Sequence, residues 1–242
     1  MSRKPAKKTT DSAWSLLHPR YWPTWLALGV LRLFEPLPFP VLVMLGKALG
    51  SVLASMPLAF VRIARRNLEL CFPEMSAEQR ETILRAHFRS LGIGLFETAM
   101  SWWSSDARIL KLTTVSGTEH LEAALAKGKG VILLSAHFTT LEIGARSLTA
   151  RGPTNIMYRP TSNLVLERFL SRNRSRHAKR AIPRDDVRTL VSALKNNEAV
   201  WYAPDQAYRK KGAEMVPFFG IPAATNTATT RLARMTGAVV LP

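Results

Sequence analysis

The sequence is poor in cysteine and in acidic residues. It contains one cysteine, Cys71, which excludes an intrachain disulfide and a zinc site built on several cysteines, and which fits a reducing compartment. Aspartate and glutamate together number 17 against 34 lysines and arginines, so the 242 residues carry a formal net charge of +17. Such an excess of positive charge indicates an anionic partner. The candidates are nucleic acid, anionic lipid and an acidic substrate.

Several common catalytic motifs are also missing. There is no G-x-S-x-G nucleophile elbow, no H-E-x-x-H and no P-loop, so a serine hydrolase of the usual kind, a zincin and a P-loop nucleotidase are excluded. We expect neither a metal nor a cofactor. Internal repeats and low-complexity tracts are absent as well, while 47% of the residues are hydrophobic. A globular core is therefore expected.

The first 62 residues divide into a basic arm and a hydrophobic segment. Residues 1–20 are polar and carry five lysines and arginines against one acid, and two apolar stretches follow, Trp25–Phe34 and Val41–Phe60. The first is too short for a span, and the second reaches the roughly 20 residues that a span needs but contains Lys47. We expect residues 21–62 to form membrane-associating helices, because basic residues flank them on both sides and tryptophans lie near the boundary.

Three arrangements of this segment remain open. The first is a helical hairpin that dips into one leaflet, and the second is a single tilted span. In the third, Val41–Phe60 is the buried helix of a soluble core. Positive residues at both flanks favour the hairpin, since both ends then stay on the cytoplasmic side.

Residues 63–242 are predicted to form an α/β domain with a mostly parallel sheet, because expected strands and helices alternate along them. A capping box at Ser76 begins the first long helix. The expected strands are Val131–Leu134, Asn155–Tyr158, Ala199–Tyr202 and Ala238–Leu241. Helices are expected at 119–127, 141–148, 164–169, 187–195 and 227–235. Because the chain stops directly after a core strand, we expect further C-terminal residues.

The best candidate for chemistry is His137, which follows the strand Val131–Leu134 and precedes a helix. Ligands bind at that edge of open α/β sheets, and a histidine there can act as a general base near neutral pH. Glu142 can orient the imidazole if the turn between them folds back, since five helical residues lie about 140° apart. A base that acts on the substrate's own hydroxyl needs no protein nucleophile.

An ordered set of motifs resembles the bacterial lipid A biosynthesis acyltransferases, which add secondary acyl chains to lipid A precursors. The matching segments are Arg66–Glu74, the box from Ala136-His137 to Glu142, Tyr158-Arg159-Pro160 with Asn163, Pro204-Asp205-Gln206 and Val216–Gly220. They cover essentially residues 20–242, in order and with similar spacing. The resemblance implies a glycerolipid-acyltransferase-like fold and an enzyme of lipopolysaccharide biosynthesis at the bacterial inner membrane, with its catalytic domain facing the cytoplasm.

The resemblance also implies roles for individual residues. His137 matches the catalytic base and Glu142 its partner, while Arg159, Asn163 and Asp205 match substrate-binding positions. The implied donor is a thioester on acyl carrier protein, and the implied acceptor is a hydroxyl of a phosphorylated glycolipid.

A basic stretch follows this site, and its residues outnumber the acids around them: Arg168, Arg172, Arg174, Arg176, Lys179, Arg180, Arg184 and Arg188. It lacks the interleaved aromatic residues typical of nucleic-acid binding, so we expect no nucleic acid and favour an anionic membrane surface or the acidic carrier. The alternatives left open are an acyltransferase for another glycolipid, such as a mannosylated phosphoinositide, and a non-catalytic module that binds anionic lipid or nucleic acid.

Overall fold

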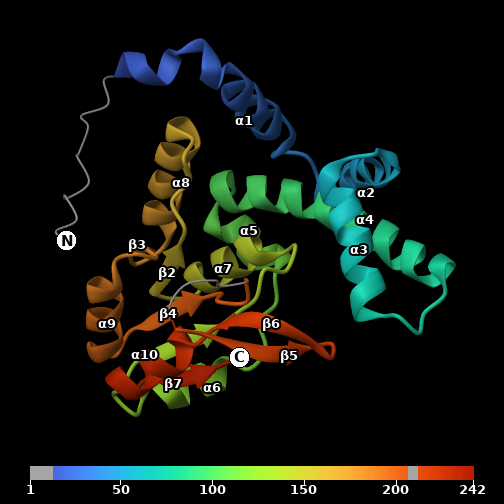
Figure 1. The fold of residues 1–242 in the computed structure, drawn as a ribbon. Helices are drawn as coiled ribbons and strands as arrows, with labels where there is room; N and C mark the ends of the chain where they lie inside the picture. Colours follow the sequence, from blue (N-terminus) through green and yellow to red (C-terminus); the bar gives the residue numbers. More distant parts are fainter. Residues whose placement is uncertain (1–12, 207–211) are drawn as a thin grey trace.

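The computed structural model describes residues 13–206 and 212–242 (Figure 1). Most of the predicted basic arm and the basic patch Arg209-Lys210-Lys211 lie outside the described residues.

A five-stranded parallel sheet forms the centre of the C-terminal part of the chain, in the order β3-β2-β4-β1-β7. Its strands are β1 (Val131–Leu134), β2 (Thr154–Tyr158), β3 (Ala181–Pro183), β4 (Ala199–Tyr202) and β7 (Val239–Leu241). In the centre, β1 pairs with β4 from Val131↔Ala199 to Leu134↔Tyr202. The short apolar run of β1 thus lies between two strands, which explains why it carries no polar alternation.

Helices cover both faces of this sheet, as the alternating pattern predicts. The helices around it are α6 (Thr118–Leu125), α7 (Leu141–Thr149), α8 (Leu164–His177), α9 (Val187–Lys195) and α10 (Ala228–Thr236). Ile132 and Val200 pack with α9 and α10 on one face, while Val131 and Ala199 pack with α6 on the other. The predicted mixed α/β class with a mostly parallel sheet is therefore confirmed.

A helical layer precedes the sheet in sequence and lies above and beside it in Figure 1. After two short 3₁₀ turns, its helices are α1 (Trp22–Phe34), α2 (Phe39–Ser55), α3 (Ala59–Cys71), α4 (Ala77–Trp103) and α5 (Asp106–Leu112). The predicted capping box begins α4: the Ser76 hydroxyl accepts from the Gln79 backbone, and the Gln79 side chain accepts from the Ser76 backbone.

The hydrophobic stretch Val41–Phe60 is not one continuous helix. Pro57 separates α2 from α3, because a proline disfavours helical geometry at the residue before it, and Met56 is accordingly extended. Within the described residues, no single helix is long and apolar enough to cross a membrane. Helices α2 and α3 together meet the length and composition of a span, but with an 83° bend between them.

One face of α2 packs very closely on α4. A Cβ added to Gly50 would lie 2.1 Å from the Phe88 carbonyl oxygen, and one added to Gly92 would lie 2.1 Å from that of Gly46. These glycines let the two backbones touch. The opposite face of α2 stays exposed at Met44 and Val52, so the helix is partly buried rather than enclosed.

Two features of the fold escape sequence prediction. The edge strand β3 has three residues, and an antiparallel hairpin formed by β5 (Ala213–Phe218) and β6 (Ile221–Asn226) follows Asp205. Each hairpin strand contains a proline, and Pro217 and Pro222 face each other beside the turn. Because a proline normally argues against a strand, the sequence does not predict this hairpin.

Candidate functional site

Three predicted site residues follow three neighbouring strands. His137 comes three residues after β1, Asp205 three residues after β4, and Arg159 directly after β2. Since these strands are parallel, their carboxyl ends lie at one edge of the sheet, where open α/β sheets bind ligands.

The loop that carries His137 is fixed by its surroundings. The Ser135 backbone N–H continues the strand pairing to the Tyr202 carbonyl (2.8 Å), and the hydroxyls of Thr139 and Ser90 lie 2.7 Å apart. Helix α4 approaches this loop closely, because a Cβ on Gly94 would lie 2.5 Å from the Thr139 carbonyl oxygen. The long helix α4 of the N-terminal layer therefore supports the loop that carries His137.

Asp205 binds His137 through both carboxylate oxygens. Oδ1 lies 2.6 Å from Nδ1 of the imidazole, and Oδ2 accepts from the His137 backbone N–H at 2.8 Å. A carboxylate at Nδ1 favours the tautomer with the proton there, which leaves Nε2 as an acceptor. The side chains are 40% and 38% exposed, so the pair lies at the surface of the site within reach of a substrate.

The pKa of Asp205 reflects this contact. Partial burial acts to raise the pKa of the carboxyl, but hydrogen bonds from the His137 backbone and ring, with the charge of the imidazolium, outweigh burial and hold it below its ordinary value. Asp205 is therefore ionised at neutral pH and is placed to orient the imidazole through Nδ1.

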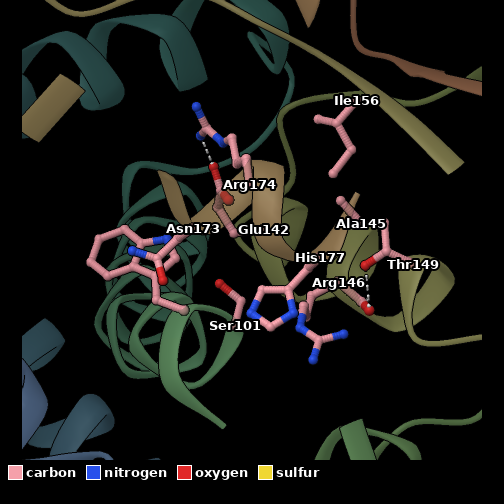
Figure 2. Close-up of a pocket in the computed structure, with 10 residues that line it drawn as sticks. Ser101, Glu142, Ala145, Arg146, Thr149, Ile156, Asn173, Arg174 and His177 are labelled. Atoms are coloured by element: carbon pink, nitrogen blue, oxygen red, sulfur yellow. Dashed lines mark hydrogen bonds and ion pairs between the residues drawn. The ribbon is translucent and has the colours of Figure 1, made fainter. Parts of the chain in front are cut away.

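The predicted pairing of Glu142 with His137 is not the one found. Glu142 instead forms an ion pair with Arg174 of α8, and no hydrogen bond among the described residues joins it to His137 (Figure 2). Helix α7 begins at Leu141, so Glu142 is already in its first turn and its side chain faces α8 rather than the loop.

Behind this ion pair lies a small cavity of about 20 Å³. Figure 2 shows Ser101, Arg146 and His177 on its other side. Arg146 is buried and forms an ion pair with Asp106, which lowers the pKa of that carboxyl chiefly through the hydrogen bond. The cavity is too small for a lipid and belongs to the packing between α4, α7 and α8.

The two other predicted binding residues differ in their availability. Arg159 is exposed and forms no hydrogen bond or ion pair with the described residues. Asn163 is already engaged: its Oδ1 accepts from the Leu166 N–H as the N-cap of α8, and its Nδ2 donates to Thr24 of α1 at 2.8 Å. Its position thus also joins α1 to α8.

The basic stretch after β2 is only partly neutralised. Arg174 pairs with Glu142, and Lys179 and Arg180 both pair with Glu198. By contrast, four exposed arginines of α8 and α9 form no ion pair with the described residues: Arg168, Arg172, Arg176 and Arg188. Within the two described ranges, no three histidine, cysteine or acidic side chains converge as metal ligands would.

Several known proteins are similar to this chain over most of its length. A family model described as "Bacterial lipid A biosynthesis acyltransferase" matches residues 9–242. The chain is 44% identical to the lipid A biosynthesis palmitoleoyltransferase of Escherichia coli K12 over 226 residues, 93% of this chain and 74% of that protein. It is 43% identical to the lauroyltransferase of the same strain over 229 residues, 94% and 75% of the two chains. A lipid A biosynthesis acyltransferase of Haemophilus influenzae is 40% identical over 216 residues, 88% and 68% of the two.

Proposed function

The chain belongs to the bacterial lipid A biosynthesis acyltransferase family, and from that premise we propose that it moves a fatty acyl chain from acyl carrier protein to a hydroxyl of a lipid A precursor. The observation that carries the chemistry is His137 at the carboxyl end of β1, with Asp205 on Nδ1 and Nε2 left as an acceptor. An acyltransferase of this kind needs a base, a thioester and a hydroxyl, and no cofactor.

In the proposed reaction, Nε2 of His137 removes the proton of the acceptor hydroxyl while its oxygen attacks the thioester carbonyl. The carbon–sulfur bond then breaks, and the thiolate leaves with the proton that His137 held. In the first turn of α7 the Leu141 N–H donates to the Phe138 carbonyl. The N–H groups of Glu142 and Ile143, by contrast, have no backbone acceptor among the described residues and are suited to stabilise the developing oxyanion. The products are an ester on the lipid and free carrier thiol.

The orienting carboxylate is assigned here to Asp205, because it binds Nδ1 directly and is ionised. Glu142 is the carboxylate that the family resemblance implies for this role, and its ion pair with Arg174 instead holds α7 to α8. Asp205→Asn and Glu142→Gln distinguish the two assignments.

Arg159 is proposed to bind a phosphate of the acceptor or the acyl carbonyl, since it is exposed at the same edge and unpaired among the described residues. Asn163 is proposed to contribute next to it while capping α8. The unpaired arginines of α8 and α9 provide the charge for an acidic carrier or an anionic lipid headgroup.

The proposal also places the chain at the cytoplasmic face of the bacterial inner membrane, with residues 21–62 as its hydrophobic anchor. Helix α1 supports this, because Leu26 and Leu33 are 70% and 74% exposed and Trp22 and Trp25 are exposed near its start. Apolar side chains of this size on one surface mark a contact with lipid or protein, and tryptophan favours the membrane interface.

The direct test is acyl transfer by the purified full chain. Acyl carrier protein loaded with a fatty acid is incubated with a tetra-acylated lipid A precursor, and the lipid is analysed by mass spectrometry. The proposal expects the precursor to gain the mass of one acyl chain. Transfer to a mannosylated phosphoinositide but not to the lipid A precursor contradicts the acceptor, and transfer to neither contradicts the proposed function.

A further inference from the structure

A second, larger cleft lies beside α7. It has a volume of about 470 Å³, which is within the range of small-molecule sites. One wall is a stripe along α7 that includes Ile143, Gly144 and Leu148, the opposite wall is the segment 113–116, and Trp201 of β4 closes it from the sheet. This is the sheet face opposite to the one that α9 and α10 cover.

The cleft has one end at the catalytic loop and the other deep along α7. It begins at Thr140, three residues after His137, and extends to Ser147, about 10 Å further along the helix axis. At that far end the Ser147 hydroxyl donates to Thr113 (3.0 Å), and Arg151 donates to both hydroxyls, at 2.6 Å to Ser147 and 3.1 Å to Thr113. These hydrogen bonds join α7 to the segment 113–116 at that end of the cleft.

Gly144 lies in the middle of this wall without a packing reason. A glycine inside a helix costs about 0.5–1 kcal/mol relative to alanine. A Cβ on Gly144 would nevertheless lie 3.7 Å from the Trp201 ring, an ordinary contact, whereas one on Gly94 would collide with backbone. What Gly144 does provide is open space between α7 and Trp201.

The lining selects the ligand chemistry. None of the side chains that line this cleft is charged, which does not suit a phosphorylated sugar: the lining consists of valine, isoleucine, leucine and tryptophan together with threonine and serine side chains. We propose that the cleft holds the hydrocarbon chain of an acyl substrate, with its carbonyl end at His137, and that Gly144 and the far end of the cleft set the chain length. This inference rests on the proposed function, because it gives the acyl chain of that reaction its place.

Two substrates supply such a chain, the donor thioester and the lipid acceptor. Turnover of the full-length protein is therefore measured against carrier thioesters of increasing chain length, and separately against acceptors of increasing chain length. In Gly144→Val the longest accepted chain should become shorter, with about a tenfold or greater loss for the longest chain that the unaltered protein accepts and little loss for short chains. The series in which the shift occurs identifies the source.

Gly29→Val is the matched control, because Gly29 also lies inside a helix and a Cβ there meets nothing within 4 Å. It should leave the chain-length profile unchanged. Gly144→Ala, which fits at ordinary contact distance, should shift the profile less than valine and covers the case in which the valine variant does not fold. An unchanged profile in a folded Gly144 variant overturns the inference.

A second readout is independent of turnover. A fatty acid with a photoreactive diazirine near its methyl end should label peptides from α7 and segment 113–116, and label them less in Gly144→Val. Labelling there without acyl transfer to lipid A precursor contradicts the proposed function and leaves the cleft assignment standing. Transfer with labelling confined to other peptides overturns the cleft assignment alone.

Discussion

At the scale of single residues, the proposed mechanism rests on the contact between His137 and Asp205. Because Asp205 occupies Nδ1, the proposal assigns Nε2 as the atom that accepts the proton of an incoming hydroxyl. In the same proposal the carboxylate stabilises the imidazolium that forms during transfer.

This assignment predicts the behaviour of the two carboxylate variants. Asp205→Asn should lower kcat by at least about a hundredfold, since the imidazole loses the carboxylate that holds the proton on Nδ1. Glu142→Gln should lower the melting temperature with a smaller loss of kcat, since its carboxylate pairs with Arg174 instead. The reverse result, with the larger loss of kcat in Glu142→Gln, would assign the orienting role to Glu142.

A second residue-scale prediction concerns Glu97 in α4. Burial raises the pKa of this carboxyl above its ordinary value of 4.5, and Oε2 has no hydrogen-bond partner. Because its pKa is raised in the native state, ionisation of Glu97 destabilises the native state relative to the unfolded state as pH rises from 4.5 through the folded pKa. Below pH 4.5 the carboxyl is protonated in both states and the destabilisation is absent. Glu97→Gln should therefore raise the unfolding free energy by about 1 kcal/mol at neutral pH.

Urea unfolding at pH 4 and pH 7 measures this difference, which should disappear at the lower pH. An equal effect at both values would show that the change acts through packing rather than through ionisation.

The sequence predicts part of this site and misses part of it. His137 and Asp205 both follow recognisable strands, so their place at one sheet edge is predictable. Their contact is not, because it depends on the order of strands β1 and β4, which are separated by 64 residues of chain between Leu134 and Ala199. The Glu142–Arg174 pair likewise depends on how α8 packs against α7, and spacing along the sequence carries no such information.

At the scale of elements, hydrophobic runs and caps predict most boundaries. The strands β1 and β4 and helix α9 have the predicted bounds, because apolar runs and helical spacing reflect burial directly. The hairpin was missed: Phe219 and Gly220 at its turn both have positive φ, which the sequence signals only at Gly220.

The contact between α2 and α4 supplies an element-scale prediction. Gly92→Ala places a Cβ against the Gly46 backbone, which cannot move as a flexible side chain can, so we expect a loss of about 1–3 kcal/mol in unfolding free energy. Gly29→Ala is the control, since an added methyl there meets open space and should stabilise α1 slightly. Urea unfolding compares the two, and a Gly92→Ala variant as stable as the unaltered protein contradicts the close packing.

At the scale of the whole molecule, the net charge of +17 and the apolar surface of the helical layer act together. Helix α3, for example, carries exposed Arg62, Arg65 and Arg66 beside the exposed Phe60 and Ile63, a combination typical of contact with anionic lipid. The charge alone does not distinguish lipid from nucleic acid, and the exposed apolar residues beside it favour the lipid surface proposed above.

Co-sedimentation with vesicles tests this contact. The chain should bind phosphatidylglycerol vesicles more tightly than phosphatidylcholine vesicles, and less tightly as salt rises, because each basic residue near the surface contributes about 1 kcal/mol. Replacing Leu26 and Leu33 together by serine should weaken binding, whereas Met235→Ser on α10, also exposed, should not. Equal binding to both kinds of vesicle, unchanged by the replacement of Leu26 and Leu33, would contradict an interfacial role for α1.

The most direct test of the account is the turnover of His137→Gln with loaded acyl carrier protein and a tetra-acylated lipid A precursor. Glutamine keeps the size of the side chain but cannot take the proton, so kcat should fall by about a hundredfold to ten-thousandfold with little change in KM. His120→Gln, at an exposed histidine of α6, should match the unaltered protein. A folded His137→Gln variant that transfers acyl chains at the unaltered rate would contradict the assignment of His137 as the base.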